Sequence, residues 1–230
     1  MTVIAIDGPA GSGKSTVARL LSDRLGYLYL DTGAMYRAAA LLALREGVSL
    51  DDGPTLAALT RAGRIGFSPQ GHVLARDEDV AEDIRRPSVS AAVSEVSAHA
   101  EVRDLLVAEQ RRVGAGRDVV IEGRDIGTVV FPDAAVKVFL TAAPEVRAER
   151  RRKELVATGE QASAAEILSA MQARDAYDSS RAVSPLRKAP DAVEVDTSAM
   201  SIDQVVDTLQ AVVHERVGSP ALPAGGSSEA

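Results

Sequence analysis

The segment Gly8–Ser15, which reads Gly-Pro-Ala-Gly-Ser-Gly-Lys-Ser, constrains the fold of this chain more than any other feature. It has the spacing of a P-loop, in which a glycine and four further residues precede Gly-Lys-Ser. The segment lies between the apolar run Val3–Ile6 and a helical pattern over Ser15–Leu25. A P-loop requires this order, because its backbone N–H groups and the following helix N-terminus together face the phosphates. A chance glycine-rich turn would not need these neighbours, so we predict a nucleotide-phosphate site.

Two residues of this loop have side chains suited to phosphate chemistry. Lys14 can reach the β and γ phosphate oxygens, and the Ser15 hydroxyl can ligate Mg²⁺. The motif is specific for a phosphate site but leaves the reaction open. The ATP-binding residues that it predicts are Gly8, Pro9, Ala10, Gly11, Ser12, Gly13, Lys14, Ser15 and Thr16.

Short apolar runs alternate with helical stretches along the chain, which is typical of a parallel sheet covered by helices on both faces. The runs are Val3–Ile6, Tyr27–Leu30, Val119–Ile121, Val136–Leu140 and Val193–Val195. We therefore expect an α/β fold with a five-stranded parallel sheet between helices. Helical spacing of Val17, Leu20, Leu21 and Leu25 predicts the first helix, and Thr32–Glu46 continues the pattern.

The alternation breaks between about residues 50 and 95. Within this region Ile65–Leu74 has the pattern of a hairpin with its turn at Pro69-Gln70-Gly71, and the charged run Arg76–Asp79 is most simply a solvated edge. We expect an insert at the carboxyl edge of the sheet, where ligands bind in open α/β folds.

Composition excludes several classes of protein. The net charge is −7, whereas proteins that bind nucleic-acid backbones carry a basic excess. There is no cysteine, which excludes disulfides and thiolate metal sites and fits a reducing compartment. No apolar stretch approaches the roughly 20 residues of a membrane span. Met1 leads straight into the first apolar run, so we expect no signal peptide and a cytoplasmic protein.

Two arginines follow predicted strands. Arg37 comes soon after the second run, and Arg124 directly follows the third. Because the carboxyl ends of parallel strands share one edge, both guanidinium groups could bind an acceptor phosphate there. Either arginine alone could equally form a surface salt bridge. A GTPase switch is disfavoured, because no sequence resembles the guanine-reading Asn-Lys-x-Asp.

Taken together, these residues resemble the bacterial cytidylate kinases, a branch of the nucleoside monophosphate kinases among P-loop kinases. The resemblance runs from Ile4 to about Val213. The motifs that carry it are Gly8–Thr16, Asp31–Arg37, Gly123–Asp133 and Arg174–Leu186. It implies a single kinase domain over residues 1–216, with a monophosphate-binding insert at about 50–95 and a short lid at about 150–165. Residues 217–230 are rich in Pro, Gly and Ser and are expected to form a disordered tail.

The resemblance also implies an activity, the transfer of the γ-phosphoryl group of ATP to CMP or dCMP with Mg²⁺. Arg37 and Arg124 would hold the CMP phosphate, with Thr32 nearby. Asp125, Ser94 and Arg103 match positions that read cytosine. The chemistry agrees, because the exocyclic amine of cytosine needs an acceptor, whereas its ring nitrogen and carbonyl need donors.

Arg174 and Asp178 lie one helical turn apart, and the resemblance assigns them to the acceptor ribose; an i,i+4 salt bridge is the alternative. The lid would begin in a basic stretch that could otherwise be a solvated helix face. Its residues are Arg147, Arg150, Arg151, Arg152 and Lys153. The sequence does not select among these arginines, and Arg181 is an equal candidate. For the catalytic group we therefore name Lys14, Arg124 and Arg181.

Other readings remain open. The acceptor could be shikimate or another nucleoside monophosphate, and a regulatory module could bind ATP without turnover. The expected mechanism is in-line attack without a covalent intermediate or a general base, and the expected state is a monomer without a macromolecular partner. His72, His99 and His214 are scattered without ligand spacing and are expected to be surface or structural residues.

Overall fold

The computed structural model describes residues 1–157 and 163–218. Its main sheet has five parallel strands in the order β2-β6-β1-β7-β8. The strands are β1 (Val3–Asp7), β2 (Leu28–Asp31), β6 (Val119–Gly123), β7 (Val136–Thr141) and β8 (Val193–Asp196). All five predicted strands are confirmed. Each extends at its carboxyl end beyond the predicted apolar run, and the added residues, Asp7 and Asp31 among them, bring polar groups to that edge.

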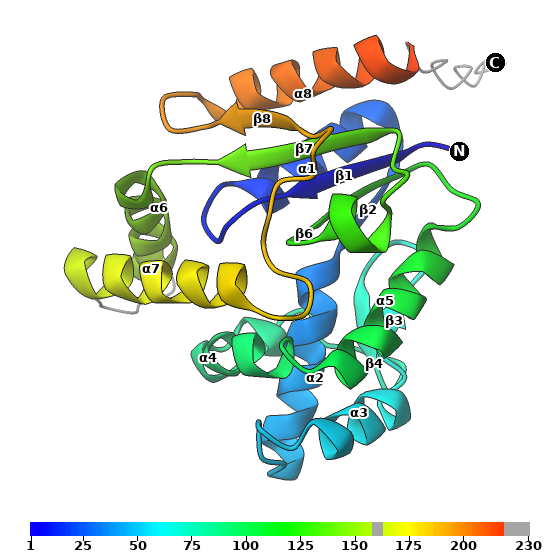
Figure 1. Cartoon of the computed structure of the whole chain (residues 1–230), viewed down its shortest axis with the longest axis vertical. Coiled ribbons are helices and arrows are strands. Elements are labelled where there is room, and N and C mark those ends of the chain that lie inside the picture. The colour runs from blue at the N-terminus through cyan, green and yellow to red at the C-terminus, as the bar shows by residue number, and fades with distance from the viewer. Residues whose placement is uncertain (158–162, 219–230) are drawn as a thin grey trace, which may run out of the picture.

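Helices cover both faces of this sheet (Figure 1). On one face α1 (Lys14–Leu25) and α8 (Ile202–Val217) pack on Ile4, Ile6 and Val138. On the other face α5 (Ala100–Gly114) and the π-helical turn η2 (Ile126–Val130) pack on Ala5, Leu30 and Ile121. One detail of the predicted α1 stripe is wrong. Leu20 is exposed, because Ala18 and Ser22 occupy the buried face beside Leu21.

Helix α2 (Thr32–Glu46) leaves the carboxyl edge of the sheet and enters a second hydrophobic core (Figure 1). Small alanine side chains along α2 allow it to be surrounded, so that its residues 38–43 are all nearly inaccessible. The elements that follow α2 are α3 (Gly53–Ala62), β3 (Gly66–Phe67), β4 (Val73–Ala75), β5 (Glu78–Asp79), η1 (Asp83–Arg85) and α4 (Pro87–Val96). Of these, α3, β4, η1 and α4 pack on α2. The second core also includes Val102 and Leu106 of α5, beyond the predicted boundary at residue 95.

The predicted hairpin is confirmed, since β3 and β4 pair antiparallel with Phe67 opposite Val73. Its turn contains Gly71 at φ +87°, a conformation that side chains disfavour. A Cβ at Gly71 would also lie 2.4 Å from the carbonyl oxygen of Tyr29. The tip of the hairpin therefore rests directly on the backbone of β2.

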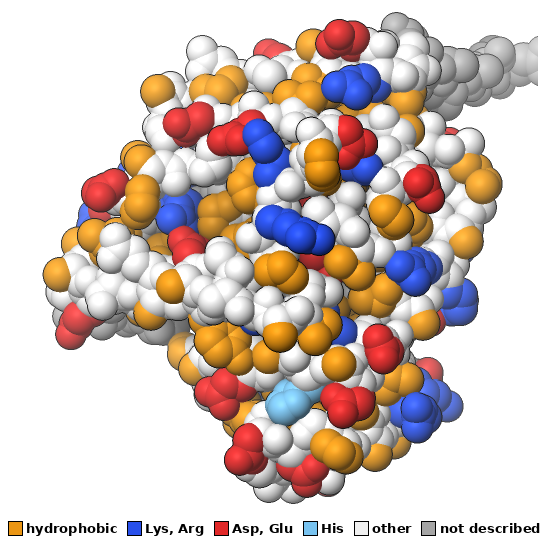
Figure 2. Space-filling view, in the orientation of Figure 1, with side chains coloured by type: hydrophobic (Ala, Val, Ile, Leu, Met, Phe, Trp, Pro, Cys, Tyr) orange, Lys and Arg blue, Asp and Glu red, His pale blue; other side chains and the backbone are white. Residues whose placement is uncertain are grey.

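Helices α6 (Pro144–Ala157) and α7 (Ala164–Ser180) form a separate arm around Ala148, Ile167 and Met171. The predicted lid at about 150–165 lies partly outside the described residues, as does all of the predicted tail except Val217 and Gly218. Acidic and basic side chains are interspersed over the face drawn in Figure 2. Within the described ranges, no helix combines the length and apolar character needed to span a membrane.

Candidate active site

The P-loop turns tightly between β1 and α1. A Cβ at Gly8 would meet the carbonyl oxygen of Leu140 at 2.0 Å, so only glycine allows the loop to pass β7 so closely. The Lys14 ammonium group is buried and donates to the carbonyl oxygen of Pro9 at 2.7 Å. Ser15 follows Lys14 in the first turn of α1 and is exposed. The loop therefore presents a cation and backbone N–H groups at one point, as phosphate binding requires.

A cavity of about 800 Å³ opens beside this loop. Its walls come from the P-loop, the N-terminus of α2, the loop after β6, α4 and the α6–α7 arm. The predicted site residues that line it are Ala10, Gly11, Gly13, Lys14, Ser15, Thr16, Thr32, Arg37, Ser94, Arg103, Arg124, Asp125, Arg174, Asp178 and Arg181. Gly8, Pro9 and Ser12 are not lining residues. Ser12 and Pro9 act from behind the loop, where the Ser12 hydroxyl donates to the Pro9 carbonyl oxygen at 3.1 Å.

The part of the cavity away from the P-loop contains a buried ion pair between Arg103 of α5 and Asp125. Arg103 also donates to the carbonyl oxygen of Ser97 at 3.3 Å, and its guanidinium lies 5.2 Å from the centre of the Tyr36 ring. Ser94 lies on α4, one turn before Ser97. These groups place a fixed acceptor and a fixed donor side by side at a cavity wall.

One carboxylate at the cavity wall is shared by several arginines. Asp178 of α7 is buried and lies 3.4 Å from Arg124, 3.9 Å from Arg181 and 4.0 Å from Arg174. Burial and the nearby Arg124 charge lower the pKa of Arg174. Arg37 is held separately by Asp31, at 2.6 Å. Three guanidinium groups thus surround the single carboxylate of Asp178.

Sequence reasoning missed several residues that shape this site. Glu122, at the end of β6, is buried and accepts a hydrogen bond from the Tyr29 hydroxyl at 2.5 Å. Burial raises the pKa of Glu122 and lowers that of Lys14, and the two groups interact. Asp31 and Tyr36 also line the cavity. Glu122 and Asp31 could have been found from their positions directly after apolar runs, where polar side chains reach the carboxyl edge.

The arginines of α6 separate by helix face. Arg147 donates to the carbonyl oxygen of Ala10 at 3.1 Å and pairs with Asp175 of α7 at 2.6 Å. Arg150 donates to the carbonyl oxygen of Thr197 at 2.7 Å. Both therefore brace the P-loop region, whereas Arg151 lines the cavity.

The remaining basic residues of α6 lie on a different side. Arg152 and Lys153 contact Glu149 of the same helix, at 2.7 and 4.0 Å, and neither is a lining residue. This arrangement matches the solvated face that was the alternative for this stretch. Of the arginines at 147, 150, 151 and 152, only Arg151 therefore lines the cavity.

The histidines lie away from this cavity. His72 contacts Asp79 on the surface at 3.1 Å, and His214 is in the last turn of α8. A ring nitrogen of His99 lies 2.7 Å from the carbonyl oxygen of Leu50 and ties α5 to the segment before α3. They are surface or structural residues, as predicted.

The family model for cytidylate kinase matches residues 4–215 of this chain. The chain belongs to the cytidylate kinase family. A cytidylate kinase of Rhodococcus jostii (strain RHA1) is 54% identical over 222 residues, which cover 94% of this chain and 96% of that protein. A cytidylate kinase of Geobacter sulfurreducens is 48% identical, and the match covers 93% of each chain.

A solved structure shares the overall fold of this cytidylate kinase family member. It is the crystal structure of an uncharacterized protein from Eubacterium ventriosum ATCC 27560, which is 11% identical. The superposition has a TM-score of 0.50 and covers 94% of this chain and all of the other. At this identity the likeness concerns the fold alone.

The residues near the P-loop fit a magnesium ion. Mg²⁺ in nucleotide sites takes one or two protein oxygens and completes its shell with phosphate oxygens and water. Ser15 is exposed at the loop and lines the cavity together with the Glu122 carboxylate. This hard-oxygen environment suits Mg²⁺ beside a bound triphosphate.

Proposed function

We propose that this protein transfers the γ-phosphoryl group of ATP to CMP, and also to dCMP, giving ADP and CDP or dCDP. One observation carries the proposal beyond the family assignment. The buried Arg103–Asp125 pair lies at the wall of the same cavity that Lys14 and the P-loop open into. A donor and an acceptor for a base and a phosphate cradle for ATP thus line one cavity.

Base selection follows from the fixed polarity of that pair. The Asp125 carboxylate can accept from the exocyclic amine of cytosine, and the Arg103 guanidinium can donate to its ring nitrogen and carbonyl. Ser94 lines the same region and adds a hydroxyl. Uracil presents a carbonyl and an N–H where cytosine has the amine and the bare nitrogen. Binding uracil would therefore leave buried polar groups unpaired, which is the costly kind of mismatch.

The guanidinium groups at the cavity wall are suited to the rest of the nucleotide. We assign Arg37 and Arg124 to the CMP phosphate, with Thr32 beside them, because guanidinium forks bind phosphate by paired hydrogen bonds. We assign Arg174 and Asp178 to the ribose. Each of these arginines contacts a carboxylate in this structure, so the nucleotide phosphate would compete with Asp31 and Asp178 for them.

Phosphoryl transfer in this site rests on positioning and charge. Lys14, Arg124 and Arg181 would stabilise the negative charge that spreads over the transferred group. The CMP phosphate oxygen attacks in line and needs no general base, because it is already ionised at neutral pH. Ser15 would hold Mg²⁺ together with the nucleotide phosphates, and the ion would supply positive charge beside them.

The proposal also includes the arrangement of the whole protein. We assign residues 1–216 to one kinase domain that acts as a monomer in the cytoplasm. The elements from about residue 50 to 95 form the monophosphate-binding part, which the second hydrophobic core around α2 supports. The segment at about 150–165 is the lid that excludes water once both nucleotides are bound.

The test is a coupled assay of ADP formation with Mg·ATP and CMP, dCMP, UMP or AMP in turn. We expect fast turnover with CMP and dCMP, slow turnover with UMP and none with AMP. If no monophosphate stimulates ADP formation while ATP still binds, a nucleotide-binding regulatory module replaces this proposal. Equal rates with CMP and UMP would overturn the assignment of Arg103 and Asp125 to base selection.

A further inference from the structure

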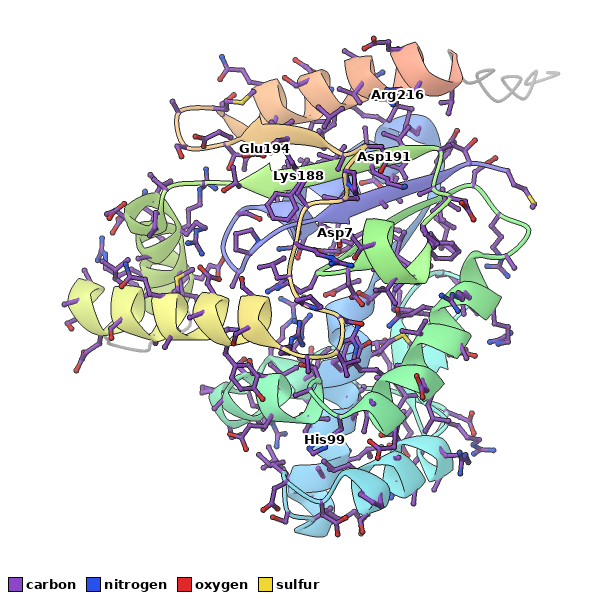
Figure 3. The ribbon with its side chains drawn as sticks, in the orientation of Figure 1. Asp7, His99, Lys188, Asp191, Glu194 and Arg216 are labelled. Carbon is purple, nitrogen blue, oxygen red and sulfur yellow. The ribbon has the colours of Figure 1, made fainter. Side chains whose placement is uncertain are left out.

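The last residue of β1 is a buried carboxylate that the proposed mechanism does not use. Asp7 is 4% exposed, and Figure 3 labels it at the carboxyl end of β1. Its Oδ1 accepts a hydrogen bond from the backbone N–H of Ile126 at 2.8 Å, and its Oδ2 accepts one from that of Gly127, also at 2.8 Å. Both carboxylate oxygens of Asp7 thus accept hydrogen bonds from a segment more than a hundred residues away in the chain.

These two N–H groups belong to the first residues of the π-helical turn η2, which begins at Ile126. The first N–H groups of a helical turn lack partners within the turn and need an acceptor from elsewhere. Asp125 precedes the turn, and its carbonyl oxygen accepts from Val129 at 2.8 Å. Its own side chain makes no capping hydrogen bond and pairs with Arg103 instead. Asp7 therefore caps the turn, so that the Asp125 carboxylate can pair with Arg103 at the cavity wall.

Gly127 lies in contact with side chains of two neighbouring strands. A Cβ there would lie 3.4 Å from Asp7 Oδ2 and 3.2 Å from the side-chain stem of Lys137 on β7. The side-chain stem of Lys137 lies beside Gly127, and its ammonium group pairs with Asp191 at 2.8 Å. The start of η2 thus contacts β1 through Asp7 and β7 through Lys137.

We propose that Asp7 is a positioning residue that fixes Arg124 and Asp125 in the geometry that binds the acceptor nucleotide, by capping the turn directly after them. This inference rests on the proposed function, because it assumes that Arg124 and Asp125 contact CMP. Asp7 itself is not a lining residue of the cavity. Asp7 is also the residue directly before Gly8. The end of β1 is therefore joined covalently to the P-loop and by hydrogen bonds to the segment that binds the acceptor.

The choice of a charged residue at this place supports a role in the site rather than in folding. Ionising a carboxylate away from water is unfavourable unless strong partners repay the cost. Asp7 has Lys14 of α1 nearby as a compensating cation, but Asp125 adds a second negative charge. An asparagine would fill the same volume without the buried charge. It would accept only one of the two hydrogen bonds, because its NH₂ group would face the second N–H.

The variant Asp7→Asn tests the proposal by isothermal titration calorimetry of CMP and of ATP separately. We expect the dissociation constant for CMP to rise about tenfold, since hydrogen bonds to a charged acceptor are worth that much in an equilibrium. The dissociation constant for ATP should rise less than that for CMP, although Asp7 also interacts with the nearby Lys14 charge.

Ser201→Ala is the matched control. Ser201 caps α8 by accepting from the Gln204 N–H at 3.2 Å, and it is not a lining residue of the cavity. We expect the substitution to remove a helix cap without changing the affinity for CMP or for ATP. The proposal is overturned if Asp7→Asn leaves CMP affinity unchanged, or if it weakens ATP as much as CMP. Failure of the wild type to bind or phosphorylate CMP would instead overturn the proposed function.

Discussion

Arg103 and Asp125 form an ion pair whose side chains are only 4% and 5% exposed, although they come from α5 and from the loop after β6. Removing two such charges from water is expensive, and their attraction repays the cost only when both partners are present. One further atom of the pair, Arg103 Nε, is buried without a hydrogen-bond partner. The pair is therefore better explained as a prepared binding surface than as a source of stability.

Asp125→Ala should both destabilise the protein and abolish base selection. The substitution leaves the Arg103 guanidinium buried without its carboxylate, a change that costs about 3–5 kcal/mol in comparable sites. We expect kcat/KM with CMP to fall at least about a hundredfold, because the cytosine amine loses its acceptor. Urea unfolding and the coupled assay measure the two effects.

The double variant Arg103→Met/Asp125→Leu separates these effects. Replacing a buried pair by apolar residues is often neutral for stability, so most of the unfolding free energy should return. Activity with CMP should not return. A double variant that is stable and still prefers CMP to UMP would contradict the role that we assign to the pair.

Lys14→Met should abolish transfer without unfolding the protein. Burial lowers the pKa of Lys14, which means that the charged ammonium group is held at a cost in the substrate-free protein. We expect kcat to fall by about a factor of 10² to 10³, typical for the loss of a group that stabilises developing charge. The melting temperature should stay the same or rise. A clear drop in melting temperature would show instead that Lys14 is mainly a structural residue.

Arg151 and Arg152 offer a matched pair for the lid. They are adjacent on α6, but only Arg151 lines the cavity, whereas Arg152 pairs with Glu149. Arg151→Ala should lower kcat about tenfold or more, because its charge would be close to the transferred group. Arg152→Ala should stay within about twofold of the wild type, as surface pairs contribute little. Equal effects of the two substitutions in the coupled assay would argue against this distinction.

Asp7 should make stability depend on pH in an unusual direction. Burial raises the pKa of Asp7 from 3.8 to about 6, so the folded state holds this proton more tightly than the unfolded state. As the pH falls from above 6 to below 4, the wild type should therefore gain stability relative to Asp7→Asn. The gain is at most about 3 kcal/mol, from a shift of about two pKa units. Urea unfolding of both proteins at several pH values measures this difference, and a constant difference would contradict it.

Much of the fold could be predicted because the P-loop fixes the order strand, loop, helix and the apolar runs repeat it. The strand ends were predicted too short, since Asp7, Asp31 and Gly123 interrupt the apolar pattern although they still pair in the sheet. The exposure of Leu20 could not be foreseen, because a leucine on either edge of a helical stripe fits the same periodicity.

The candidate site was predictable where topology decides position. Arg37 and Arg124 meet at one cavity because parallel strands end at the same edge. The division among the α6 arginines was not predictable. Arg147 donates to a carbonyl oxygen of the P-loop, Arg150 donates to one that directly follows β8, and Arg151 lines the cavity. In the sequence, however, all three belong to the same run of basic residues. Asp7 was missed because a carboxylate at a strand end resembles an ordinary strand boundary.

The sharing of Asp178 among Arg124, Arg174 and Arg181 has a consequence for how substrates arrive. The three guanidinium groups around this single carboxylate leave an attractive field in the cavity of a protein whose net charge is −7. Clefts of one sign focus field lines and raise the encounter rate of oppositely charged ligands, and dissolved ions screen that effect beyond about 8 Å at physiological ionic strength. The association rate of the acceptor should therefore fall as salt is added, even though the protein as a whole repels anions.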